Sequence, residues 1–425
     1  MPSPGDHEAF VERHLQHNLV ALGADYALFM VGLSFASQST ILPAFAEHLQ
    51  APNVVIGAIP AVMTVGWFLP SLFAAGHTET LARRLPFVLR YTIWERAPFL
   101  VLALAAFFLA ERAPGLTLAL LLLMLLVITG AGGALMPAWM DIVGRAIPTM
   151  LRGRFFAAAS VGANVGALAG SFGTAYVLAA VRAPWSYGAC FLAAAVFMGL
   201  SYIALALTRE PPAVVTSPPV PLGTYLARIP TLLRRDTNLT WFLAARAFAV
   251  IGMMAGGFYT VYALRAFGAA SWQVGVFTAI FLAGQIAGNV VLGWLADRAG
   301  HRLVIMIGVG ATVAANAVAL VAPSLPVFSV VFALAGVHVA AINVSSLNVL
   351  LEFAPGMDER PTYVGLGTTS MAPVAFGAPL LAGVMVDVLG FEPVFGVAAL
   401  FGLVGLSLLV TRVRDPRHQS ETVVE

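Results

Sequence analysis

Twelve long apolar runs constrain the fold of this chain more than any other feature of its sequence. A helix of about 20 apolar residues crosses the roughly 30 Å hydrocarbon core of a bilayer and bonds its own backbone groups there. Residues that favour turns, such as Pro52, Pro114, Pro184 and Pro323, separate the runs. We therefore predict an all-α integral membrane protein with spans at 20–45, 54–75, 87–109, 116–142, 155–180, 185–207, 241–264, 273–296, 303–321, 327–351, 364–388 and 394–411.

The composition agrees with a membrane protein and argues against other classes. Of the 425 residues, 60% are apolar and 10% are charged, whereas soluble domains carry about 25% charged residues. The net charge of +2 is too small to indicate a nucleic-acid partner. The single cysteine, Cys190, excludes an internal disulfide, and we expect no metal or other cofactor.

The arginines predict the orientation of the spans, because positively charged loops stay in the cytoplasm. With both termini inside, most of the arginines lie in cytoplasmic segments, and only Arg112, Arg182 and Arg265 lie in outer loops. The first residues lack the basic and short apolar regions of a cleaved signal peptide. We expect a multi-pass protein of the cell (inner) membrane with two cytoplasmic termini.

A proline-rich stretch divides the spans into six and six. It covers residues 208–240 and predicts a cytoplasmic linker between an N-terminal bundle, 1–207, and a C-terminal bundle, 241–425. Within it, residues 222–233 are either a short helix on the inner leaflet or part of a solvated tether. The halves also echo each other, as in transporters built from repeats, because an acid followed by a proline ends both the fourth and the tenth spans.

The loop after the eighth span carries a specific pattern. Residues 293–302 read Gly-Trp-Leu-Ala-Asp-Arg-Ala-Gly-His-Arg. Gly293 and Gly300 allow close helix approach and a tight turn. The pattern resembles the loop signature of the major facilitator superfamily, and with twelve spans the resemblance covers essentially the whole chain. It implies two pseudo-symmetric six-helix bundles that work as a monomer by alternating access.

The resemblance also implies a conformational gate on the cytoplasmic side. Asp297 would meet the start of the fifth span near Arg154 and latch the two halves together. A negative charge at a helix N-terminus is stabilised by about 0.3–1 kcal/mol. Arg298 or Arg302 can then reach Glu352 at the end of the tenth span.

The corresponding loop of the first half departs from the family pattern. Thr80 stands where the family has an aspartate. Either the preceding Glu79 replaces it or the latch is one-sided. Arg83 or Arg84 is predicted to pair with Asp141 at the end of the fourth span.

Charged residues inside the predicted spans are candidates for function, because each costs about 2.5–3.5 kcal/mol at a helix centre on insertion scales. Asp25, Glu95 and His338 are candidate proton-binding groups, and Asp25, Arg246 and His338 are candidate substrate contacts. The family architecture places the first, fourth, seventh and tenth helices around the central cavity, so we expect Asp25, Arg246 and His338 to face one aqueous path.

Each of these groups also has a structural interpretation. Asp25 can brace the cytoplasmic end of its helix, Arg246 can be interfacial, and His338 can be a packing histidine. Glu95 and Arg96 are adjacent, so their side chains point about 100° apart on a helix, and we expect a structural brace rather than mutual neutralisation.

The predicted cavity helices indicate only a coarse substrate class. Apolar and aromatic residues predominate, and methionines such as Met253 suit amphiphilic ligands. The other candidate substrate contacts are Trp139, Tyr259, Gln285, Asn289 and Asn343.

We expect a secondary transporter that couples protons to the export of small amphiphilic or organic molecules. Its partners would be the substrate, protons and membrane lipids. A uniporter or nutrient importer of the same fold is an alternative, and a lipid scramblase or flippase is an alternative of another class. An enzyme is not expected, because the chain lacks an ATP-binding loop, His-Glu-x-x-His and Gly-x-Ser-x-Gly.

Overall fold

The computed structural model describes residues 4–78, 81, 83–211, 232–354 and 360–415, and within them the regular structure is helical. Each predicted span overlaps one helical segment that is long and apolar enough to cross a membrane, so the all-α, twelve-span prediction is confirmed. These segments are Ala9–Phe35, Asn53–Pro70, Leu85–Phe108, Pro114–Ala146, Thr149–Ala180, Trp185–Ala206, Thr237–Ala266, Ser271–Ala299, His301–Val321, Leu325–Phe353, Thr362–Leu389 and Phe391–Thr411.

The chain divides into two compact units, and each is described by itself. The first unit comprises residues 1–50 and 62–220, and the second comprises 51–61 and 221–425. The division after residue 220 falls inside the predicted linker, 208–240. Most of that linker, including most of the predicted interfacial helix at 222–233, lies outside the described residues.

The first unit contains most of the helices up to residue 206. They are α1 (Pro4–Phe35), α2 (Ile41–His48), α3 (Asn53–Thr78) from residue 62 onward, α4 (Leu85–Tyr91), α5 (Ile93–Arg96), α6 (Pro98–Phe108), α7 (Pro114–Ala146), α8 (Thr149–Ala180) and α9 (Trp185–Ala206).

Two spans of the first unit differ from their predicted bounds. The first was predicted at 20–45, but α1 begins at Pro4 and ends at Phe35, and α2 follows as a separate helix. The third was predicted as one helix but is divided into α4, α5 and α6. Pro98 lacks a backbone N–H and cannot bond to the turn before it, which is consistent with a new helix starting there.

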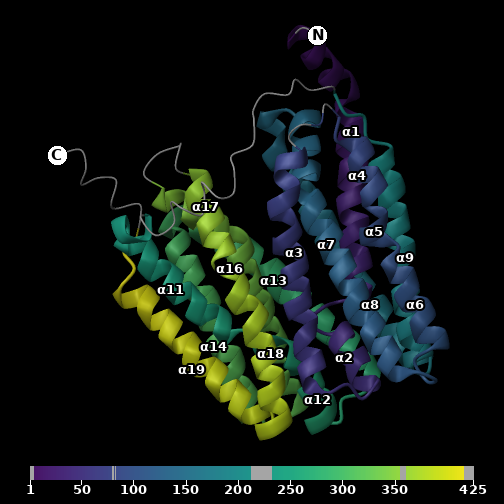
Figure 1. Ribbon diagram of the computed structural model, residues 1–425, viewed down its shortest axis with the longest axis vertical. Helices are drawn as coiled ribbons and strands as arrows, with labels where there is room; N and C mark the ends of the chain where they lie inside the picture. Colours follow the sequence, from purple (N-terminus) through teal and green to yellow (C-terminus); the bar gives the residue numbers. More distant parts are fainter. Residues whose placement is uncertain (1–3, 79–80, 82, 212–231, 355–359, 416–425) are drawn as a thin grey trace. The chain divides into compact units, whose positions relative to one another are not determined.

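Small residues allow close packing in the first unit. Figure 1 shows α1 beside α8, and the two helices meet at glycines of α8. A methyl group at Gly166 or Gly170 would overlap Val31 or Ser34 of α1. The core of the unit gathers Leu22, Ile142 and Phe155 from α1, α7 and α8. These contacts hold the candidate residues of α1 and α7 inside the unit.

The second unit begins with the first turns of α3, where Asp387 accepts hydrogen bonds from the backbone N–H groups of Asn53 and Val54 at 3.1 and 3.2 Å. Its other helices are α11 (Thr237–Gly252), η1 (Gly256–Phe258), α12 (Tyr259–Ala266), α13 (Ser271–Ala299), α14 (His301–Val321), α15 (Leu325–Phe328), α16 (Val330–Phe353), α17 (Arg360–Thr369), α18 (Ala372–Leu389) and α19 (Phe391–Thr411).

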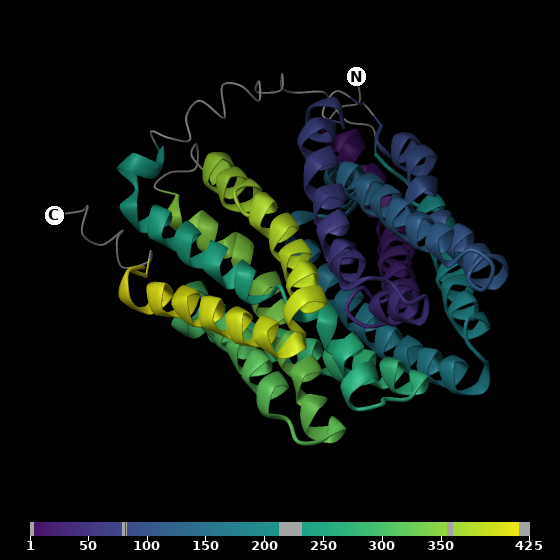
Figure 2. The same cartoon turned by 60° about the horizontal axis from the view of Figure 1, so that its bottom comes forward.

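Close backbone approach also shapes the second unit. A methyl group at Gly284 of α13 would overlap the carbonyl oxygen of Ala333, and one at Gly336 of α16 would overlap that of Phe281. Figures 1 and 2 both show α19, in yellow, beside α11, in teal. There a methyl group at Gly252 of α11 would overlap the backbone of Gly402, and one at Gly405 of α19 would overlap that of Ala245. Helices therefore touch without large side chains between them.

Candidate functional site

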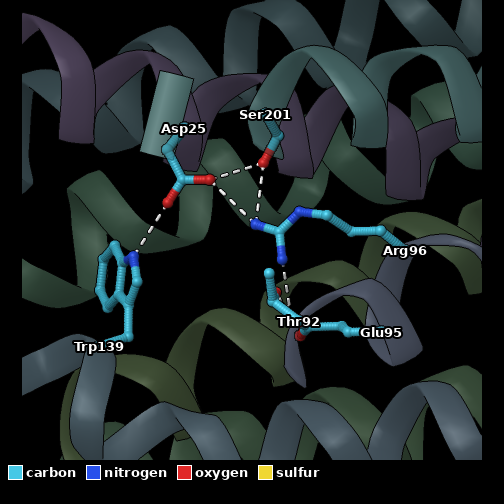
Figure 3. Close-up of polar contacts among 6 residues, drawn as sticks. All are labelled: Asp25, Thr92, Glu95, Arg96, Trp139 and Ser201. Atoms are coloured by element: carbon cyan, nitrogen blue, oxygen red, sulfur yellow. Dashed lines mark hydrogen bonds and ion pairs between the residues drawn. The ribbon is translucent and has the colours of Figure 1, made fainter. Parts of the chain in front are cut away.

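A buried polar network lies inside the first unit, centred on Asp25 of α1. The Asp25 carboxylate accepts three hydrogen bonds: from Arg96 Nη2 at 3.0 Å, from Ser201 Oγ at 2.6 Å and from Trp139 Nε1 at 2.9 Å. The donors come from α5, α9 and α7 (Figure 3). Only 3% of the Asp25 surface is exposed. Burial of this charge is offset by an opposite charge and two neutral donors.

Arg96 joins Asp25 to a second carboxylate. Its Nη2 bonds to Asp25, and its Nη1 donates to Glu95 Oε2 at 3.1 Å (Figure 3). Thr92 Oγ1 donates to the same Glu95 oxygen at 3.0 Å. The expectation that the adjacent Glu95 and Arg96 do not neutralise each other is wrong, because a long guanidinium side chain in the short helix α5 can turn back toward the preceding residue.

The hydrogen bonds of Asp25 lie within the first unit. Asp25 is directed toward α5 and α9, inside the first unit (Figure 3). All three of its donors are protein groups, so both oxygens of the carboxylate have protein partners in this structure. A shared aqueous path with Arg246 and His338 would involve both units and remains a prediction.

Three members of the network, Thr92, Arg96 and Ser201, were not among the candidate site residues. Arg96 carried a signal, since it is an arginine inside an apolar span. Its adjacency to Glu95 suggested a local brace, and the helix contacts that bring it to Asp25 could not be inferred. Ser201 carried no signal, because serine is common in membrane helices and its role depends on α9 lying against α1.

The candidates of the second unit have other surroundings. Arg246 on α11 is partly buried, and its Nη2 donates to Ser346 Oγ at 2.7 Å. His338 on α16 is 2% exposed, and its Nδ1 lies 2.8 Å from the carbonyl oxygen of Gly308. Both residues line one cavity within the second unit. The structure thus brings these two predicted residues to a common cavity.

The remaining candidate substrate contacts divide into two kinds. Trp139 is held by Asp25, and the Tyr259 hydroxyl donates to Asn316 Oδ1 at 2.9 Å in the core of the second unit. Their polar atoms therefore have structural partners. Gln285 and Asn289 are half-buried and Asn343 is exposed, and none of these three makes a side-chain hydrogen bond within the described chain. Their amides are free to bind another molecule, so their role as substrate contacts remains a prediction.

The predicted pairing at the end of the fourth span is present. Arg84 forms an ion pair with Asp141, and Arg145, one turn further along α7, pairs with the same carboxylate. Arg83 and Arg154 are exposed, and neither makes an ion pair within the described residues. Arg84 is therefore the arginine that ties the loop before α4 to α7.

Glu210, which the sequence did not single out, holds the start of α4. Its two carboxylate oxygens accept hydrogen bonds from the backbone N–H groups of Arg84 and Leu85, both at 2.8 Å. A carboxylate at a helix N-terminus satisfies free donors and interacts favourably with the helix dipole.

We predict that Glu210→Ala lowers the free energy of unfolding by about 1–2 kcal/mol, because the cap is lost and Glu210 is buried. Thermal unfolding in detergent measures the effect. Glu111→Ala, which removes an exposed glutamate, is the control. Equal melting temperatures for the two variants would contradict a capping role for Glu210.

The signature loop of the second unit forms the expected tight turn. Gly300 has a φ of 90° and lies between α13 and α14. Asp297 and Arg298 are exposed, and the Arg298 guanidinium lies 4.1 Å from the Trp294 ring centroid. Gly293 has open space around it. The predicted contact of Asp297 with the start of α8 would join the two units and remains a prediction.

Arg302 has a different partner from the expected one. Its Nη2 donates to the carbonyl oxygens of Leu409 and Val410 at 2.6 and 3.2 Å, at the end of α19. Glu352, the expected partner, lies in the last turn of α16. Neither Arg298 nor Arg302 pairs with Glu352 among the described residues. A guanidinium at a helix C-terminus binds carbonyl groups that have no intrahelical partner, which explains the alternative contact.

The sequence of the second unit matches a known family. Residues 242–425 match the model of the Major Facilitator Superfamily. The resemblance to the major facilitator superfamily is confirmed. The matched segment contains α13, α14 and the signature loop between them.

Solved structures extend the likeness in fold to nearly the whole chain. A mutant of the nucleoside transporter NupG has a TM-score of 0.74 at 12% identity, over 93% of this chain and 100% of that chain. A bacterial homologue of the human lysosomal transporter Spinster has a TM-score of 0.68 at 14% identity, over 94% and 97%. A D-xylose–proton symporter has a TM-score of 0.69 at 12% identity, over 94% and 99%. The sequence likeness to the family therefore covers residues 242–425, and nearly the whole chain shares the fold of these membrane transporters.

Proposed function

We propose that this protein couples protons to the export of small amphiphilic organic molecules and that the cluster of Asp25, Arg96 and Glu95 binds the coupled proton. One observation supports the proposal above all: two carboxylates inside the first unit share one guanidinium. Charge of this kind within a membrane span is costly, which favours a functional role.

The charges of the cluster define its two states. With both carboxylates ionised, the cluster carries a net charge of −1 in a buried site. Addition of one proton makes it neutral, since one carboxylate then balances Arg96. The neutral state suits a closed, dry environment, whereas the charged state is stabilised when water reaches the cluster. Proton binding therefore favours the state of the carrier in which the cluster is dry.

The hydrogen bonds indicate which carboxylate takes the proton. Asp25 is bonded through both oxygens, to one charged and two neutral donors. Glu95 receives both of its described hydrogen bonds on Oε2, and Oε1 has none within the described chain. Hydrogen bonds to a carboxylate favour its ionised form. We infer that Glu95 Oε1 gains and loses the proton while Asp25 keeps Arg96 in place.

The substrate class rests on the apolar and aromatic character of the predicted cavity helices. The titles of the similar structures name a nucleoside transporter and a D-xylose–proton symporter, so the fold accommodates different cargoes and, in one case, proton coupling. Export is the direction we assign. Both termini are expected to be cytoplasmic. Export is therefore transport away from the side of the membrane on which the termini lie.

A transport assay in proteoliposomes tests the proposal. A ligand found by thermal-shift screening is radiolabelled, and its accumulation is measured under imposed pH gradients of either sign. We expect gradient-driven accumulation for the wild type and at least a tenfold loss for Glu95→Gln. Exchange of labelled for unlabelled ligand should persist in this variant, because the carrier still cycles.

Glu111→Gln makes the same chemical change at an exposed site and should behave as wild type. Asp25→Asn should also abolish gradient-driven accumulation. Ionised Glu95 and Arg96 then form a neutral pair, so the cluster needs no added proton to become neutral. Accumulation that ignores the gradient in the wild type would contradict proton coupling and indicate a uniporter. Gradient-driven uptake in the opposite direction would contradict export. Flipping of fluorescent lipids without ligand transport would indicate a scramblase.

A further inference from the structure

The second unit contains a cavity that the proton network does not use. Its volume is about 160 Å³, and α11, α14, α16 and α19 contribute its walls. The walls are largely apolar and include Val250, Ile305, Ile342 and Leu409, whereas Arg246 and His338 are its two charged or titratable lining residues. An apolar cavity with a few polar groups is typical of a small-molecule site.

Arg246 supplies a cation with unused donors. Its Nη2 donates to Ser346 Oγ at 2.7 Å, and its Nη1 has a long contact of 3.5 Å with the carbonyl oxygen of Gly367. A guanidinium has five N–H donors. Arg246 forms no ion pair within the described chain. A partly buried guanidinium without an acid favours an anionic ligand group, since a carboxylate would bind it with charge-assisted hydrogen bonds.

His338 supplies an acceptor with no partner. His338 Nδ1 lies 2.8 Å from the carbonyl oxygen of Gly308 and 2.8 Å from the hydroxyl oxygen of Thr312. A carbonyl oxygen only accepts hydrogen bonds, so we assign the ring hydrogen to Nδ1. In the neutral ring, Nε2 then has a free lone pair. His338 Nε2 is buried and has no hydrogen-bond partner in the described residues. A ligand hydroxyl or N–H would satisfy it.

These two polar groups lie near different ends of the cavity. Arg246 contacts Ser346, which follows His338 by eight residues on α16. Eight residues of α-helix span about 12 Å. The residues between them that line the cavity are apolar, such as Val339 and Ile342. The site therefore favours an anionic group near Arg246, an apolar group in the middle and a hydrogen-bond donor near His338.

We propose that this cavity binds an amphiphilic hydroxy acid, with the carboxylate on Arg246 and the hydroxyl donating to His338 Nε2. An apolar cavity of about 150 Å³ accommodates benzene, so the body of the ligand is the size of one aromatic ring or a short aliphatic chain. The cavity lies wholly in the second unit. The inference therefore goes beyond the proposed function and does not depend on proton coupling at Glu95.

Calorimetric binding to the full-length protein in detergent tests the site with three probes. They are 3-(4-hydroxyphenyl)propionate, 3-phenylpropionate, which lacks the hydroxyl, and 3-(4-hydroxyphenyl)propan-1-ol, which lacks the carboxylate. We expect the hydroxy acid to bind wild type at least tenfold more tightly than either analogue. Equal affinity for all three probes, or no binding of the hydroxy acid, would overturn the proposal, and this comparison needs no variant.

Two variants assign the contacts. Arg246→Gln should abolish the preference for the acid over the alcohol and keep the preference for the hydroxyl. His338→Phe should do the reverse. Arg412→Gln removes the same charge from an exposed position of the second unit and should bind as wild type. Retention of both preferences in Arg246→Gln and His338→Phe, or their loss in Arg412→Gln, would place the ligand outside this cavity.

Discussion

Replacement of Arg96 by methionine is expected to lower the free energy of unfolding by about 3–5 kcal/mol, the typical loss when one member of a buried ion cluster is removed. Arg96 is 7% exposed and balances Asp25 and Glu95. Without it, two carboxylates remain inside the first unit with only neutral donors. Thermal unfolding in detergent and the yield of monodisperse protein measure the effect.

A compensating variant separates the charge from simple loss of packing. Asp25→Asn and Glu95→Gln combined with Arg96→Met leave a neutral cluster, and we expect most of the lost stability to return. Arg112→Met, at an exposed position between α6 and α7, should melt as wild type. If the triple variant is no more stable than Arg96→Met, the shared guanidinium does not stabilise the unit by balancing the two acids.

The same substitution should destabilise the protein at one glycine and not at another. Gly336→Ala is expected to destabilise the protein by about 1–3 kcal/mol, the usual cost of overpacking, because the new methyl group would overlap the carbonyl oxygen of Phe281. Gly310 of α14 has open space around it, so Gly310→Ala should be neutral or stabilise the helix by up to about 1 kcal/mol.

Melting temperatures of the two glycine variants, measured side by side in the same detergent, test this pair. A backbone carbonyl cannot rotate away as a flexible side chain can, so α13 and α16 have to separate to accept the methyl group. A Gly336→Ala variant that melts at or above the wild-type temperature would contradict the close approach of these helices.

The sequence predicted the spans well and their internal breaks less well. All twelve runs correspond to helical segments, because the cost of exposing backbone groups to lipid makes the apolar length decisive. The break around Pro98 and the end of α1 at Phe35 were missed. Hydropathy averaged over a span does not register where a helix is interrupted within it.

The sequence pointed to the acidic residues of the candidate site but not to the side chains that bind them. Asp25 and Glu95 stood out because charge inside an apolar run is costly. Their common partner, Arg96, was assigned to a local brace, and Ser201 was not considered. Likewise Arg84 was expected near Asp141, but its anchor Glu210 was not. Side-chain partners from distant segments depend on how the helices pack.

The order of polar and apolar residues by itself determined that this chain crosses a membrane twelve times and turns tightly at Gly300, because transfer of each span into lipid and the backbone freedom of glycine are local properties. Only the tertiary structure decided that Asp25 and Glu95 share Arg96 and that Arg246 and His338 line one cavity. Those contacts join helices far apart in the chain, and the small residues that let the helices approach select which side chains meet.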